Sequence, residues 1–232
     1  AKMIEDDVVD YCVAGASDAS LIPLMLAAYH NMKALARGPM LPYDKRRSGF
    51  LVGEGAGILM LESLESAKSR GAKIYGEILG FGCGSDSTDW VHFSRKESAL
   101  ARVIQNLLKK TNLQAREIDY INLHGTATVD GDIYETEQIK QAFGKEAYKI
   151  PMSSTKSMTG HMLGASGAVE IIASLIAMQE GFLPPTMGLE KPDPACDLDY
   201  VALQSRQAQI NTALSLSLGF GGHIAAIVLR KV

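Results

Sequence analysis

The feature that most constrains the fold is an alternation of strand-like and helix-like segments, joined by short links, along most of the chain. Short apolar runs predict the strands, and longer segments with apolar residues three and four positions apart predict the helices. Such an alternation favours a layered α/β fold. The predicted strands are 10–15, 50–63, 73–84, 118–125, 148–155, 212–219 and 224–231, and the predicted helices are 21–36, 62–71, 97–112, 135–144 and 168–181.

Two of these segments carry further information. Helix 168–181 is apolar nearly all round, which predicts burial between two layers. Glycines interrupt strand 50–63, and glycines inside a strand mark bulges or places where another backbone comes close. Residues 40–49 are predicted to form a loop. Its basic residues, Lys45, Arg46 and Arg47, most simply belong to a solvated surface, and docking of an acidic partner is the alternative.

Composition excludes several classes of protein. The chain has 232 residues, 47% of them hydrophobic, so it can bury a large core. A net charge of −3 does not indicate the basic surface that nucleic-acid-binding proteins need. No apolar run reaches the roughly 20 residues that cross a bilayer. Three scattered cysteines argue against a disulfide framework and favour the cytoplasm.

Polar and small residues follow several predicted strands at the point where each strand ends. These segments are 124–128, 154–161 and 218–223, and they contain His124, Lys156 and His161. Since sites in open α/β sheets gather at the carboxyl ends of strands, we expect these three side chains to converge. Each of them alone is more often structural; their co-occurrence favours a reactive site.

Other kinds of site do not fit the spacing. The run around Ser166 lacks the second glycine of a nucleophile elbow, and no glycine-rich segment has the pattern of a dinucleotide or phosphate loop. No metal site is predicted, because the histidines show no metal-ligand spacing and no cysteine accompanies them in a ligand pattern. The histidines are His30, His92, His124, His161 and His223.

The motifs together resemble a known family. "VAGASDA", "PYDKRRSGFLVGEGAGILMLE", "INLHGTATVDGDIYE", "SSTKSMTGHMLGASGAVE", "PDPACDLDYV" and "LGFGGH" occur in this order. They resemble the C-terminal part of the β-ketoacyl-acyl carrier protein synthases, most closely the elongating, dimeric type. The resemblance implies a thiolase-like fold with five-stranded mixed sheets, incomplete at the N-terminus. Residues 1–70 would end its N-terminal half and residues 71–232 would form its C-terminal half.

The resemblance also implies roles for individual residues. His124 and His161 would hold the thioester carbonyl of a malonyl unit while it loses carbon dioxide. Lys156 would support the site, with Glu135 as its acidic partner. The substrate-binding residues implied are two threonines for the pantetheine arm, Thr126 and Thr128, and an aromatic gate in a glycine-rich turn, Phe220 and Gly221.

The substrates of such an enzyme are carried on the phosphopantetheine of acyl carrier protein, so no other cofactor is implied. The partners implied are acyl carrier protein and a second subunit, in a homodimer or a ketosynthase-type heterodimer, with no nucleic acid and no membrane. A cytoplasmic location is expected.

Segment 1–10 reads as the end of a helix without a cap, as if the chain began within that helix. The resemblance places the family's nucleophilic cysteine at the start of this helix, so alignment of the motifs puts it just upstream of Ala1. Neither Cys12, Cys83 nor Cys196 matches its position. The chain alone is therefore expected to be an inactive piece of a longer synthase.

Some substitutions surround the expected acyl and pantetheine sites, namely Ser48, Leu218 and His223. Because of these substitutions, the resemblance does not predict the length of the acyl chain that the enzyme would accept. The leading prediction is an acyltransferase for decarboxylative Claisen condensation. The alternative is a non-catalytic partner subunit that shapes the chain-length tunnel, and a thiolase or hydrolase fits less well.

Overall fold

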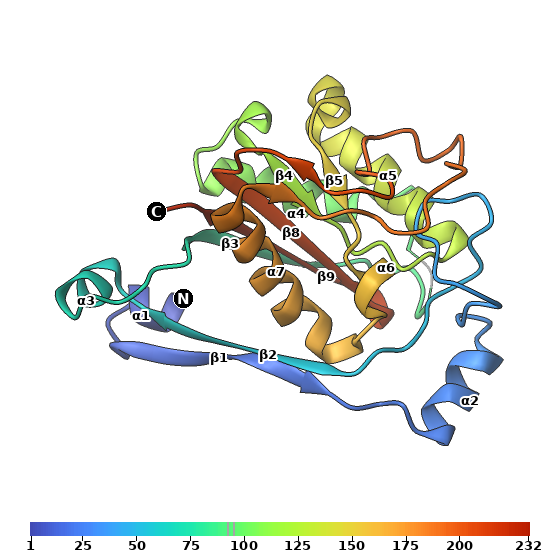
Figure 1. Cartoon of the computed structure of the whole chain (residues 1–232), viewed down its shortest axis with the longest axis horizontal. Helices are drawn as coiled ribbons and strands as arrows, with labels where there is room; N and C mark the ends of the chain where they lie inside the picture. Colours follow the sequence, from blue (N-terminus) through green and yellow to red (C-terminus); the bar gives the residue numbers. More distant parts are fainter. Residues whose placement is uncertain (92, 95) are drawn as a thin grey trace.

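The computed structural model describes residues 1–91, 93–94 and 96–232. The described chain forms a large sheet, a two-stranded ribbon and a helix between them (Figure 1). The ribbon pairs β1 with β2, the large sheet has the order β3-β9-β8-β4-β5, and β6 pairs with β7. The strands are β1 Tyr11–Asp18, β2 Gly55–Glu62, β3 Glu77–Ser85, β4 Tyr120–Asn122, β5 Met152–Ser153, β6 Phe182–Leu183, β7 Arg206–Gln207, β8 Thr212–Gly219 and β9 His223–Arg230.

The large sheet is mixed. Strand β9 pairs antiparallel with both β3 and β8, whereas β4 runs parallel to β5 and β8. The predicted α/β fold with a five-stranded mixed sheet is therefore confirmed. The parallel edge matters for function, because the chain leaves β4 and β5 at the same end of the sheet and both exits lead into loops that can build one site.

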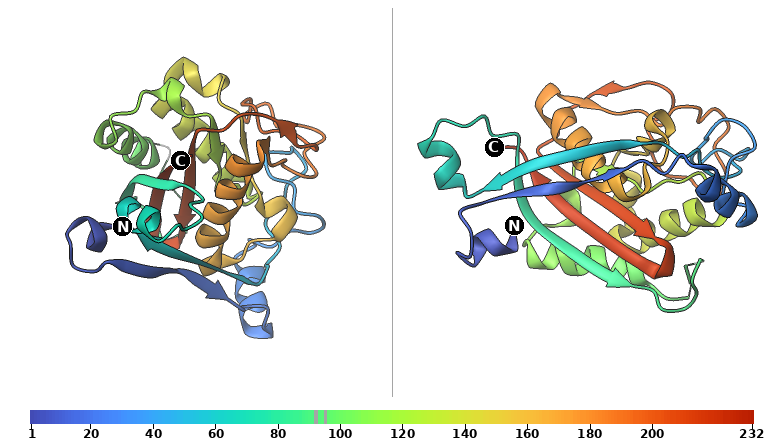
Figure 2. Two further views of the ribbon diagram at one scale, coloured as in Figure 1. Left: turned by 60° about the vertical axis from the view of Figure 1, so that its left-hand side comes forward. Right: turned by 90° about the horizontal axis from the view of Figure 1, so that it is seen from below.

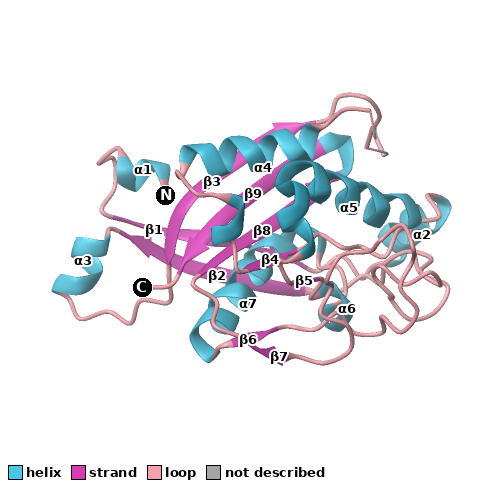
Figure 3. Ribbon diagram, turned by 90° about the horizontal axis from the view of Figure 1, so that it is seen from above, coloured by secondary structure: helices cyan, strands magenta, loops and turns pink. Residues whose placement is uncertain are grey.

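Helices cover both faces of the large sheet. Helix α4 packs on β3 and β9 with α5 beside it (Figure 3), while α7 lies on the opposite face, between β8 and the ribbon strand β2 (Figure 2). The predicted position of helix 168–181 between two layers is thus confirmed, although part of its surface, at Ile176, is exposed. The helices are α1 Lys2–Glu5, α2 Pro23–Asn31, α3 Leu64–Ser69, α4 Ala99–Lys110, α5 Val129–Phe143, α6 Lys156–Thr159 and α7 Ser166–Glu180.

The core follows the alternation of side chains along β8. Leu214 and Leu216 belong to the cluster under α4 and α5, whereas Ala213 belongs to the cluster that contains Leu175 and Met178 of α7. Successive residues of a strand point to opposite faces of its sheet, so one apolar strand supplies two cores. Strand β8 is therefore buried along most of its length, although serines alternate with its leucines.

Several predicted elements have different bounds in the structure. Residues 50–54 do not continue β2, because Phe50 and Val52 make isolated bridges with other segments. Strand β5 begins only after Pro151, which has no N–H to donate to a ladder. Helix α5 begins at Val129, earlier than predicted, and carries Asp130 and Asp132 in its first turn, where acidic groups suit the helix dipole. Short elements that the sequence did not suggest are α6, β6 and β7.

None of the described helices combines the length and the apolar character needed to cross a bilayer.

Close packing against α7 explains why a glycine stands at position 57 of β2. A Cβ atom at this position would lie 2.9 Å from the backbone carbon of Ala168 and from the backbone nitrogen of Val169. The register of β1 against β2 runs without a bulge, so Gly57 marks the close approach of β2 to α7. Close approach was one of the two roles predicted for these glycines.

The change Gly57→Ala is therefore expected to push β2 away from α7 and to lower the free energy of unfolding by about 1–3 kcal/mol. Urea denaturation of the gene product that carries this chain measures the loss. Gly38→Ala serves as the matched control, since a Cβ there would meet no atom within 4 Å. Equal stabilities of the two variants would contradict the close packing.

Candidate active site

Two histidines from distant parts of the sequence meet beside one cavity. His124 follows β4, and His161 follows α6. Their ring centroids lie 5.4 Å apart with an interplanar angle of 85°. Both rings line a cavity of about 870 Å³. The sequence prediction that these two side chains converge is therefore confirmed.

Hydrogen bonds orient the ring of His161. The backbone N–H of Leu163 donates to Nδ1 across 3.2 Å, and the Oγ of Ser166 lies 3.0 Å from the same atom. Because Nδ1 accepts a hydrogen bond from a backbone amide, the neutral ring carries its proton on Nε2. The edge of this ring also packs against Phe50, with centroids 5.1 Å apart. His161 thus presents a donor in a fixed orientation.

Burial keeps both imidazoles neutral. It lowers the pKa of His161 to about 3, and the positive charge of Lys156 acts in the same direction. The pKa of His124 is likewise held well below its usual value, first by burial, then by Lys156 and His161. Its Nδ1 is buried without a hydrogen-bond partner among the described residues. At neutral pH the pair can donate hydrogen bonds without carrying positive charge.

The acidic partner of Lys156 is Glu170, and the predicted pairing with Glu135 is wrong. The Lys156 ammonium group at the start of α6 forms a buried ion pair with the Glu170 carboxylate in the second turn of α7. Burial raises the pKa of Glu170 to about 7, although Lys156 opposes this shift. The signal that sequence reasoning missed is an acidic residue, Glu170, in the second turn of a helix that is mostly apolar.

Glu135 instead holds the backbone that carries His124. Its carboxylate accepts hydrogen bonds from the N–H of His124 at 2.8 Å, the N–H of Gly125 at 2.9 Å and the hydroxyl of Tyr43 at 2.7 Å. Burial raises the pKa of this carboxyl group, and these donors oppose the shift. Gly125 adopts a φ of +39°, which a glycine tolerates without strain. Glu135 therefore fixes the turn from β4 into the site.

The residues expected to bind substrate lie around the same cavity. Thr126 and Thr128 line it and their Oγ1 atoms are 3.1 Å apart. Phe220 also lines it, with 46% of its surface exposed. Gly221 lies in the adjoining turn, with a φ of +75°, and donates its N–H to the carbonyl of Trp90 across 2.8 Å.

Some residues that line the cavity were not predicted from the sequence. Phe93 and Tyr134 stack with ring centroids 4.9 Å apart and both line the cavity. They come from the loop before α4 and from α5, and no spacing in the sequence connects them. Ser48 and Leu218, two of the departures from the family pattern, line the cavity as well.

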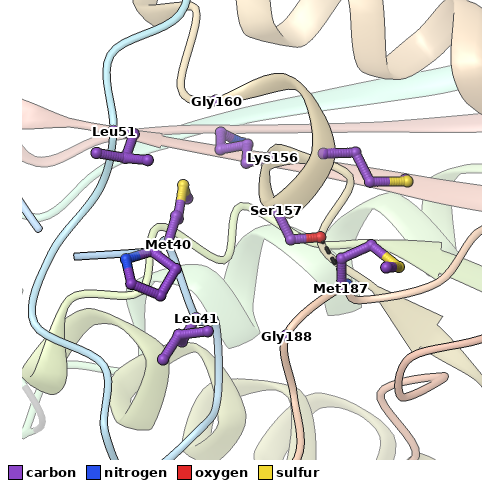
Figure 4. A pocket seen from close by; sticks show the side chains of 10 residues that line it. Met40, Leu41, Leu51, Lys156, Ser157, Gly160, Met187 and Gly188 are labelled. Carbon is purple, nitrogen blue, oxygen red and sulfur yellow. Dashed lines mark hydrogen bonds between the residues drawn. The ribbon is translucent and has the colours of Figure 1, made fainter.

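A smaller cavity, of about 320 Å³, lies on another side of the Lys156 segment (Figure 4). Met40, Leu51 and Met187 line it, so it is mainly apolar. The Ser157 hydroxyl accepts the N–H of Met187 across 2.8 Å and closes one side. Lys156 contributes to this wall, but its ammonium group is engaged by Glu170.

The cysteines stay apart from the main cavity. Cys12 is half-buried in β1, Cys83 is exposed in β3, and Cys196 is buried, where burial raises the pKa of its thiol to about 11. None of them lines the cavity. Among the described residues, no three His, Cys, Asp or Glu side chains come together in a group that could hold a metal ion; His92 lies outside the described residues.

Comparison with known proteins assigns a family to this geometry. The family model for the beta-ketoacyl synthase C-terminal domain matches residues 75–190, and the model for the N-terminal domain matches residues 1–67. The chain is 44% identical to 3-oxoacyl-[acyl-carrier-protein] synthase 2 of Synechocystis sp., over 99% of this chain and 57% of that protein. It is 40% identical to the putative polyketide beta-ketoacyl synthase 1 of Streptomyces halstedii, over 97% of this chain and 55% of that protein.

Solved structures agree. In AntDE:AntF, a type II polyketide synthase acyl-carrier protein in complex with its ketosynthase, the matching chain has a TM-score of 0.97 and 38% identity. That match covers all of this chain and 58% of the other, so the thiolase-like fold is confirmed while the chain spans little more than half the length of its relatives. The chain belongs to the beta-ketoacyl synthase family.

Proposed function

We propose that the protein carrying this chain is a 3-oxoacyl-acyl carrier protein synthase, an acyltransferase of fatty acid or polyketide synthesis. It joins an acyl thioester to malonyl-acyl carrier protein by decarboxylative Claisen condensation. The observation that carries this proposal is the pair of neutral imidazoles, with ring centroids 5.4 Å apart, in a cavity that Thr126 and Thr128 also line.

The site fits the electronic demands of this reaction. Loss of carbon dioxide from the malonyl unit leaves an electron pair that delocalises onto the thioester oxygen. Donors already in position, Nε2–H of His161 and the ring of His124, stabilise that oxyanion, and one such donor typically contributes about 2.7–4 kcal/mol. The resulting carbanion attacks the acyl thioester carbon. A carbon–carbon bond forms, and the thiolate that carried the acyl group leaves. We propose that this thiolate belongs to a cysteine outside the chain described.

The Lys156–Glu170 pair influences the protonation of the two imidazoles. A positive charge close to two buried rings disfavours their protonation, as the lowered pKa values of both histidines indicate. Neutral rings stabilise an oxyanion by hydrogen bonding and remain weak acids, so they do not quench the carbanion with a proton. The pair therefore sets the electrostatics of the site without moving protons itself.

The residues that we propose bind the substrate line the wall of the cavity. The phosphopantetheine arm of acyl carrier protein lies along Thr126 and Thr128, and Phe220 beside Gly221 gates the acyl site. No further cofactor is needed. We also propose a cytoplasmic location and a second subunit, either a copy of this protein or a ketosynthase-type partner.

The test is a condensation assay on the purified gene product. Incubation with an acyl thioester of acyl carrier protein and malonyl-acyl carrier protein should yield a 3-oxoacyl product two carbons longer, identified by mass spectrometry. A folded protein that forms no such product would favour the alternative, a non-catalytic partner subunit. The residue at the family's nucleophile position separates the two, since cysteine is required for the enzyme.

Protonation of His161 is expected to add no acid limb to the rate of malonyl decarboxylation between about pH 8 and 5. An ordinary imidazole would take up a proton near pH 6.5, but the lowered pKa of His161, about 3, keeps this ring neutral throughout the range. Release of labelled carbon dioxide measures the rate, and circular dichroism at each pH checks that the protein stays folded. Since the pKa of Glu170 is about 7, the test is repeated with Glu170→Gln, and an acid limb near pH 6.5 that persists in this variant would contradict neutral imidazoles held by burial.

A further inference from the structure

Arg47 is buried, contrary to the expectation of a solvated loop. Only 1% of its side chain is exposed, whereas 39% of the neighbouring Arg46 side chain is exposed. Burying a guanidinium group is costly unless hydrogen bonds and opposite charge compensate it. The groups around Arg47 that supply this compensation show what the residue holds in place.

The Arg47 guanidinium binds the start of α5. Its Nε donates to the carbonyl of Thr128 across 3.3 Å, and its Nη2 donates to the carbonyl of Val129 across 2.8 Å. Its Nη1 donates to the Asp44 carbonyl at 3.0 Å and to the Asp193 carboxylate at 2.7 Å. One side chain thus ties together the 40–49 loop, the start of α5 and the loop that contains Asp193.

Asp132 holds the same turn from inside α5. Its carboxylate accepts the N–H of Ala127 at 3.1 Å and the N–H of Tyr43 at 2.8 Å, and it lies 3.5 Å from Nε of Arg47. Ala127 has a φ of +60°, a left-handed conformation that costs free energy for a residue with a Cβ atom. Gly49 adds a third support, because its N–H donates to the carbonyl of Ala127 across 2.8 Å.

The supported turn, residues 126–129, contributes Thr126 and Thr128 to the wall of the main cavity. We propose that Arg47 is a positioning residue that keeps this turn in the shape that binds the pantetheine arm of the substrate. This inference rests on the proposed function. Arg47 touches no substrate itself; it acts through the carbonyls of Thr128 and Val129, in the turn whose threonines line the cavity.

Arg47→Lys tests this role, since lysine keeps the charge but cannot reach carbonyls in several directions at once. Decarboxylation is measured with two substrates, malonyl-pantetheine and the S-ethyl thioester of malonic acid, which has no arm. We expect KM for malonyl-pantetheine to rise about tenfold with little change in kcat. The S-ethyl thioester should react as it does with the unmodified protein. The matched control is Arg46→Lys, which should leave both substrates unaffected.

The outcomes separate this inference from the proposed function. If the unmodified gene product decarboxylates neither thioester, the proposed function fails. If Arg47→Lys slows both thioesters equally, or changes neither, the positioning role is overturned. If that variant does not fold, Asp193→Asn decides, because it leaves the Arg47 bonds to Thr128 and Val129 but weakens one anchor of the guanidinium. It should raise KM for malonyl-pantetheine about threefold, and an unchanged KM would overturn the role.

Discussion

Replacing His161 by alanine is expected to slow malonyl decarboxylation by about 100- to 1000-fold, the usual effect of losing one preorganised oxyanion donor. The reason is geometric. The N–H of Leu163 and the hydroxyl of Ser166 fix Nδ1, and this leaves the Nε2 proton free for the developing negative oxygen. Alanine removes the donor while His124 remains. The measurement is the single-turnover release of labelled carbon dioxide from malonyl-acyl carrier protein.

Two further variants show whether the lost group is the Nε2 donor. His161→Gln can place an amide N–H near the former Nε2 position, so it should recover part of the lost rate. His30→Ala serves as the matched control, because His30 is an exposed histidine on α2 that does not line the cavity. A rate within threefold of the unmodified protein for His161→Ala would remove this residue from the mechanism.

The sequence predicted which residues lie at the centre of the site, but it did not predict all the residues that hold them in place. His124, Lys156 and His161 could be brought together because each follows a predicted strand, and strand exits at one end of a sheet meet. The partner of Lys156 could not be found in this way. Glu170 stands in an apolar helix, and only the packing of α7 against the sheet brings its carboxylate to the ammonium group.

The burial of Arg47 could not be predicted from the sequence either, for the same reason. A basic run in a loop is usually solvated, and the partners that bury this guanidinium come from distant parts of the chain, at Asp132 and Asp193. The strand bounds were easier to predict where a turn signal separates two strands. The predicted strands 212–219 and 224–231 agree closely with β8 and β9, because the glycine-rich turn between them marks where one ends and the other begins. The N-terminal part of α5 was missed, since Gly131 and its acidic neighbours are weak helix formers.

Glu170→Leu is expected to lower the free energy of unfolding by about 3–5 kcal/mol. The substitution leaves the Lys156 ammonium group without its carboxylate at a site where only 1% of the lysine side chain is exposed. An uncompensated buried charge costs far more than the loss of the attraction itself. Urea denaturation of the gene product measures the change. Glu180→Leu, at an exposed position in the last turn of the same helix, should alter stability by less than about 0.5 kcal/mol.

The double variant Lys156→Met, Glu170→Leu decides what the pair is for. If the pair existed mainly for stability, removing both charges would leave the fold at least as weak as the single variant. Desolvation offsets most of the attraction in a buried pair, so an apolar replacement of both partners should restore most of the lost stability. The same double variant should lower decarboxylation activity, because it removes the Lys156 charge that adds to burial in disfavouring protonation of His124 and His161. A stable but less active double variant would mean that the ion pair is kept for the chemistry, whereas an unstable one would make it a structural element of the α6–α7 contact.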